Sequence, residues 1–164
     1  MKSIQTKSIN LAIAAILLTV PMTGSAVAGE KLVPFKGSLS ATEPFVVENG
    51  FLIVSGTGGG IATHLGSFTL TWAFRVNTAD GTGSGTVRFT AANGDTLTTS
   101  GTGTSGPTDV PGVFHITELQ TITGGTGRFA GATGHLTVER LTDLNTGFTS
   151  GSFQGVISSV ASSK

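Results

Sequence analysis

The stretch Ser67-Phe-Thr-Leu-Thr-Trp-Ala-Phe-Arg-Val-Asn77 decides the fold class of this chain. Every second side chain in it is apolar, and these side chains share one face: Phe68, Leu70, Trp72, Phe74 and Val76. Thr69, Thr71 and Arg75 point to the other face. Such strict alternation is typical of a β-strand with one buried and one solvated side.

Seven further segments of strand length lie on either side of it, separated by Gly, Asn and Asp. With the first stretch, the expected strands are residues 33–40, 51–63, 67–77, 86–91, 96–103, 113–123, 134–143 and 148–158. Asn93-Gly94-Asp95 predicts a hairpin with a tight primed turn, which needs residues that tolerate positive φ. The mostly short connections predict an all-β fold, an eight-stranded antiparallel β-barrel, and its closure would remove aggregation-prone edges.

The N-terminus has the features of a secretory signal peptide. Lys2 and Lys7 precede an apolar run over residues 11–20, and Ala26-Val27-Ala28 supplies the small residues that signal peptidase requires. We expect residues 1–28 to be removed and residues 29–164 to form one barrel domain, secreted or periplasmic. The apolar run is about half the length that spans a bilayer.

Composition narrows the range of partners. The chain has no Cys, so packing and strand pairing must stabilise it without disulfides. Basic and acidic residues balance at nine each, and loss of Lys2 and Lys7 leaves a small negative charge. This predicts no nucleic-acid binding. One Trp and no Tyr cannot supply the two aromatic girdles of an outer-membrane barrel, so no membrane insertion is expected.

No catalytic or cofactor motif stands out. Two glycine-rich matches to G-x-G-x-x-G/A, at residues 101–106 and 125–130, lack the following helix of a dinucleotide site. If Ile122 pairs with Gly134, His115 and His135 are about 20 Å apart, too far to share a metal ion. The sequence therefore predicts neither a metal site nor a cofactor.

The same register places two charged residues inside the expected barrel. Phe114, Ile116, Ile122, Leu136 and Val138 would share the interior face, and Glu118 and Arg140 would lie on it as diagonal neighbours. One interpretation is a structural ion pair at a barrel end. The other is a ligand-binding pair that orients a polar group of a molecule in the lumen. His64, whose glycine-rich surroundings suggest a bulge near a barrel mouth, is the third candidate ligand-binding residue.

The glycine-rich element Ile122-Thr-Gly-Gly-Thr-Gly-Arg-Phe-Ala-Gly-Ala-Thr-Gly134 resembles the G-G-[ST]-G-x-F-x-x-A-x-G element of plant dirigent proteins and allene oxide cyclases. The likeness continues to about residue 158, and the whole chain resembles secreted bacterial proteins that carry the same element. Phe129 would plug the barrel corner that this element forms.

The resemblance implies an eight-stranded barrel whose apolar interior chaperones a reactive small molecule. Thr133 stands where dirigent proteins often have Arg, and the Tyr and Cys of the cyclase pocket are missing from this chain. Cyclase activity therefore does not carry over. The oligomeric state stays open, although the resembled barrels commonly associate through their outer faces.

Three functions follow from these observations. The first is a non-enzymatic secreted module that binds a small, mostly apolar ligand in its lumen. The second is an isomerase- or cyclase-like enzyme, in which Glu118 and Arg140 would steer a reactive substrate. The third is a structural or adhesive surface protein with a filled core. The volume of the lumen separates the third function from the other two.

Overall fold

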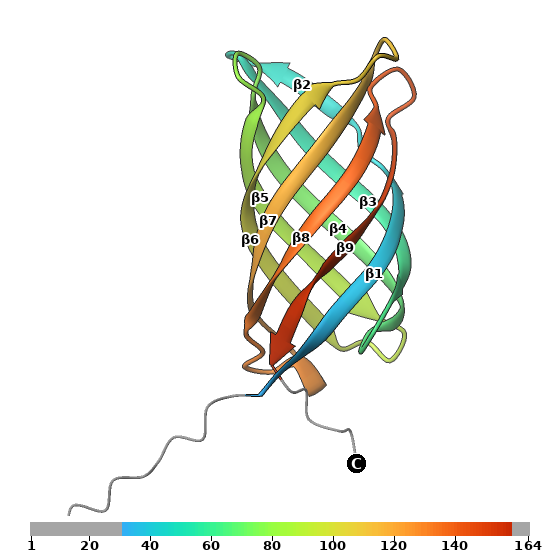
Figure 1. The fold of residues 1–164 in the computed structure, drawn as a ribbon, viewed down its shortest axis with the longest axis vertical. Coiled ribbons are helices and arrows are strands. Elements are labelled where there is room, and N and C mark those ends of the chain that lie inside the picture. Colours follow the sequence, from blue (N-terminus) through green and yellow to red (C-terminus); the bar gives the residue numbers. More distant parts are fainter. Residues whose placement is uncertain (1–30, 159–164) are drawn as a thin grey trace, which may run out of the picture.

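The computed structural model describes residues 31–158, so the predicted signal peptide lies outside the described residues. These residues form a sheet of nine antiparallel strands that curls into a cylinder (Figure 1). The strands are β1 (Leu32–Thr42), β2 (Phe45–Glu48), β3 (Phe51–Ala62), β4 (Gly66–Asn77), β5 (Thr82–Ala91), β6 (Thr96–Pro107), β7 (Val113–Gly125), β8 (Gly134–Asp143) and β9 (Phe148–Ser158). None of the described residues forms a helix long and apolar enough to cross a membrane.

The cylinder closes because β1 pairs with β9 on one side and with β3 on the other. β2 is a continuation of β1: Thr42 opposes Thr57 and Phe45 opposes Val54, which is one unbroken register along β3. The break falls at Glu43 and Pro44, where proline has no amide hydrogen for the ladder. The predicted closed eight-stranded barrel is thus confirmed, with β2 as an extra strand.

Several predicted boundaries were wrong. The sequence missed β2, and it placed the start of β5 at Thr86 and the end of β6 at Gly103, although β5 begins at Thr82 and β6 runs to Pro107. Glycine-rich segments have weak strand propensity, but the neighbouring strands pair with them along their length. Register, which depends on the partner strand, therefore overrides local composition here.

The turn chemistry also differs from the prediction. In the hairpin at Asn93-Gly94 only Gly94 has a positive φ, so this is not a primed two-residue turn. Both residues of Asn49-Gly50, between β2 and β3, have positive φ (48° and 80°), as a primed turn of type I′ requires.

The pairing of β7 with β8 is as predicted. Ile122 opposes Gly134, His115 opposes Leu141 and His135 opposes Thr121. The two histidines are thus six ladder positions apart on the outer wall. No group of three or more His, Cys, Asp or Glu among residues 31–158 is arranged to hold a metal ion.

Aromatic rings fill one half of the interior, and glycines on the neighbouring strand leave room for them. Phe68 packs against Phe89 and Phe153, with ring centroids 5.4 and 6.2 Å away, and Phe35 packs on Phe153 at 5.2 Å. On β3, Gly60 and Gly56 lie directly opposite Phe68 and Trp72. A Cβ at Gly56 would come within 2.0 Å of the indole ring of Trp72. These two glycines of β3 therefore make room for the aromatic rings of β4.

The link between β7 and β8 closes this end of the barrel, the lower end in Figure 1. It contains one 3-10 turn, η1 (Gly127–Phe129), and Gly127 and Gly131 adopt positive φ of 57° and 72°. These conformations favour glycine. The turn directs Phe129 into the core, where it is fully buried, so its predicted role as a plug is confirmed.

Replacement of this plug should be costly. We expect Phe129→Ala to lower the free energy of unfolding by about 3–5 kcal/mol, because it removes a fully buried ring and leaves a cavity. Val110→Ala, at an exposed turn position, should change it by less than about 0.5 kcal/mol. Denaturant unfolding of the two variants measures both values, and equal stabilities would contradict the assignment of Phe129 to the core.

Candidate functional site

The opposite half of the barrel contains a cavity of about 460 Å³. It lies at the end where β4 turns into β5 and β6 turns into β7, the upper end in Figure 1. Its walls are mainly apolar and are formed by Phe45, Leu52, Val54, Phe74, Val76, Pro107, Phe114, Ile116 and Leu144. The cavity therefore offers a mostly apolar surface to anything that enters from this end.

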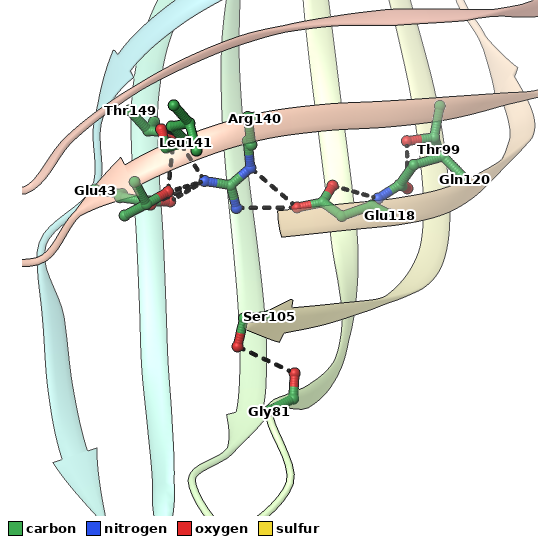
Figure 2. A network of polar contacts seen from close by, with 10 residues as sticks. Glu43, Gly81, Thr99, Ser105, Glu118, Gln120, Arg140, Leu141 and Thr149 are labelled. Atoms are coloured by element: carbon green, nitrogen blue, oxygen red, sulfur yellow. Dashed lines mark hydrogen bonds and ion pairs between the residues drawn. The ribbon is translucent and has the colours of Figure 1, made fainter. Parts of the chain in front are cut away.

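Charged groups at the base of the cavity form an ion network across the barrel interior (Figure 2). Nη1 of Arg140 lies 2.9 Å from both carboxylate oxygens of Glu43. On its other side, Nη2 and Nε of Arg140 donate to Oε1 of Glu118 at 2.9 and 3.1 Å. The three residues are 7%, 2% and 4% exposed for Arg140, Glu43 and Glu118. All three line the cavity and are otherwise enclosed by protein.

Uncharged polar side chains extend this ion network on both sides. Gln120 donates through Nε2 to Oε2 of Glu118 at 3.0 Å and accepts from the Thr99 hydroxyl at 2.9 Å. Near Glu43, the hydroxyls of Thr142 and Thr149 lie 2.8 and 3.0 Å from Nη1 of Arg140. Every one of these groups is buried. The network is thus held by hydrogen bonds from several strands, as buried polar groups require.

Glycines directly opposite the long charged side chains make space for them. Gly103 on β6 opposes Glu118, and Gly151 on β9 opposes Arg140. A Cβ at Gly151 would lie 2.5 Å from Cβ of Arg140, and one at Gly103 would lie 2.9 Å from Cγ of Glu118. The strand alternation therefore turns both side chains inward, and the glycines let them fit.

Glu43 enters the network at the break between β1 and β2. Its amide donates to the Gly147 carbonyl at 2.8 Å, and this bond ties the break to the turn between β8 and β9. The inward positions of β1 are Phe35, Leu39 and Ala41, so the same alternation continues to Glu43. The sequence prediction ended this strand at residue 40 and missed Glu43, although two more steps of period two would have placed it inside.

Trp72 separates the ion network from the aromatic half of the core. Cζ of Arg140 lies 5.3 Å from the centre of the indole ring, within the range of a cation–π contact. Trp72 is buried and does not line the cavity, which agrees with a role in the core.

A further carboxylate lies at the rim of the cavity. Asp80, in the turn between β4 and β5, accepts hydrogen bonds from the hydroxyl and the amide of Thr82 at 2.7 and 2.9 Å. The Thr82 hydroxyl, and after it the Thr82 amide, lower the pKa of this exposed carboxyl below its usual range. Asp80 is therefore anionic at neutral pH.

The structure brings together two of the three predicted site residues. Glu118 and Arg140 are in direct contact at the base of the cavity. His64 is not there: it lies in the exposed turn between β3 and β4 at the closed end, with a φ of 63°. Its Nε2 is 3.1 Å from the Pro34 carbonyl oxygen. A bulge near a barrel mouth was predicted at His64, whereas the structure has the turn between β3 and β4 there, at the closed end of the barrel.

Comparisons of the chain with protein-family models, with curated proteins and with solved structures find no match. The structure alone shows the eight-stranded antiparallel barrel. The resemblance to dirigent proteins and allene oxide cyclases stays a prediction. Fold and site define a closed antiparallel β-barrel that is solid at one end and hollow at the other, with a buried ion network between the two halves.

Removal of the cation of this network should destabilise the barrel. We expect Arg140→Met to lower the free energy of unfolding by about 3–5 kcal/mol, because it leaves Glu43 and Glu118 buried without their partner. Arg88→Met, on the exposed outer wall, should change it by less than about 0.5 kcal/mol.

The triple variant Glu43→Gln, Glu118→Gln, Arg140→Met carries no buried charge and should recover most of that loss. Thermal or denaturant unfolding gives all three values. A single variant as stable as the unmodified protein would show that the ion network is not needed to hold the strands together.

Proposed function

We propose that this protein is a secreted barrel that binds one small, mostly apolar molecule in the hollow half of its interior. The observation that carries the proposal is the cavity itself. Its volume of about 460 Å³ lies within the range of small-molecule sites, about 300–1,000 Å³. Apolar walls with a few convergent polar groups are the usual makeup of such sites.

The hollow is a consequence of which side chains point inward. Gly83 on β5 and Gly103 on β6 oppose each other in the cavity wall, so neither position contributes a side chain to fill it. In the closed half, by contrast, the phenylalanine rings occupy the equivalent space. A barrel of eight strands is just wide enough to be filled by its own side chains or to hold one small ligand. In this barrel one half is filled by side chains and the other half is wide enough to hold a small ligand. This argues against a purely structural protein with a filled core.

An anchoring role for Glu118 and Arg140 fits the geometry better than catalysis. Both oxygens of Glu118 accept hydrogen bonds, one from Arg140 and one from Gln120. A general base needs a free lone pair within reach of the substrate proton. Glu118 thus has little acceptor capacity left for a substrate proton, and the resemblance to barrels that chaperone small molecules supports binding over the isomerase- or cyclase-like alternative. The signal peptide predicted over residues 1–28 supports a site of action outside the cytoplasm.

Filling the cavity should abolish binding without unfolding the protein. Val76 lines the cavity directly opposite Gly83, so the ring of a Val76→Trp variant can lie over Gly83 as Trp72 lies over Gly56. We expect this variant to lose at least about tenfold in affinity for a neutral fluorescent apolar probe, since the ring occupies the probe's volume. Val110→Trp adds the same ring at an exposed turn position and is the matched control.

Native mass spectrometry of the protein from its natural source supplies a second test. A co-purifying small molecule that is present on the unmodified protein and missing from Val76→Trp supports the proposal. If probe affinity is the same for the unmodified protein, Val76→Trp and Val110→Trp, the cavity is not a binding site.

A further inference from the structure

We infer that the ligand carries a cationic, hydrogen-bond-donating group, of the class of hydrophobic amines, and that this group binds at the base of the cavity beside Glu43. The inference rests on the proposed binding function and adds the chemical class of the ligand. It follows from two separate properties of the cavity: its charge and its supply of hydrogen-bond donors.

The charged residues that line the cavity do not balance. Three are acidic, Glu43, Asp80 and Glu118, and one is basic, Arg140. At the base alone, two buried carboxylates share one guanidinium, which leaves one excess negative charge beneath apolar walls. Water screens charges poorly in such surroundings, so an excess charge attracts a cation more strongly than it would at the surface.

Hydrogen-bond donors are also in short supply on the Glu43 side. Nη1 of Arg140 has two hydrogens, yet four oxygens lie within 3.0 Å of it: both of Glu43 and the hydroxyls of Thr142 and Thr149. Those hydroxyls donate elsewhere, Thr142 to Thr149 and Thr149 to the Leu141 carbonyl. Glu43 thus receives only a share of one nitrogen's hydrogens, although a carboxylate offers about four acceptor sites.

Arg140 is unsuited to hold an anionic ligand. Its Nε and one hydrogen of Nη2 are used by Glu118, and its Nη1 is shared on the Glu43 side. An anion at the base of the cavity would also lie close to two carboxylates. A primary ammonium has three N–H donors and a positive charge. It therefore supplies Glu43 with the hydrogen-bond donors and the compensating charge that the protein does not provide. The apolar walls between the base and the mouth accommodate the rest of such a molecule.

Three probes of equal chain length test the inference: octylamine, octanol and octanoate. We expect octylamine to bind the full-length mature protein at least about tenfold more tightly than octanol, because its ammonium brings a positive charge and three N–H donors to Glu43, whereas the hydroxyl of octanol brings one neutral donor. Octanoate should bind most weakly of the three. Isothermal titration, or displacement of the neutral fluorescent probe, measures all three affinities.

Glu43→Gln keeps the size of the side chain and removes its charge. This variant should lose most of the preference for octylamine, because its affinity for octylamine falls far more than its affinity for octanol. Glu48→Gln makes the same change at an exposed position at the end of β2 and should keep the full preference.

The outcomes distinguish the two levels of the proposal. If none of the three probes binds, and Val76→Trp leaves the affinity for the neutral fluorescent probe unchanged, the binding function itself is wrong. If octanol binds as tightly as octylamine, the carboxylates at the base of the cavity do not select a cation, and the amine inference alone is overturned. Tightest binding of octanoate would overturn it as well, since Arg140 would then be free to pair with an anion.

Discussion

The contact on which the interior depends is the guanidinium of Arg140 between the carboxylates of Glu43 and Glu118. It joins β8 to β7 on one side and to the break between β1 and β2 on the other. A charge in this position is tolerated only with such partners, because an unpaired buried ion costs several kcal/mol. The same contact determines where the aromatic core ends, since no apolar side chain can occupy the plane of the ion network. The barrel therefore has two halves of different character.

Glycine distribution decides how each half is occupied. Where a glycine opposes a large side chain, as Gly56 opposes Trp72 and Gly151 opposes Arg140, the large side chain crosses the interior over the bare backbone. Gly83 and Gly103, which oppose each other in the cavity wall, contribute no side chain of their own to fill the hollow half. Packing in a narrow barrel thus depends on which side chains oppose each other across neighbouring strands.

The features that the sequence could predict are those that depend on residues close together in the chain. The alternation of Phe68 to Val76 identifies the strand and its buried face without reference to a partner, and the assumed pairing of Ile122 with Gly134 is the one that the structure has. From that register, the inward position and mutual contact of Glu118 and Arg140 follow directly. Phe129 could be predicted as a plug because it is the one large apolar residue in a glycine-rich corner.

The features that were missed depend on partners distant in sequence. The alternation of the first strand extends to Glu43 and could have placed it inside, but its contact with Arg140 is made across 97 positions of the chain and no local pattern shows it. His64 was placed near a barrel mouth on local grounds, but a local pattern does not tell which of the two ends a turn belongs to. The hollow also could not be foreseen, since the pairing of Gly83 with Gly103 requires the register of β5 against β6.

The ion network is better explained by binding than by stability. Apolar residues of similar volume in place of a buried ion network are often neutral or stabilising. The aromatic half of this barrel shows that the chain can fill its interior in that way, with Phe35, Phe89 and Phe153 in mutual contact or close to it. A third ionic group, Glu43, adds a second carboxylate where the pair of Glu118 and Arg140 alone would have been neutral. The Glu43 carboxylate ties the break between β1 and β2 to β8, and under the proposed function its charge would also select which molecule binds at the base of the apolar cavity.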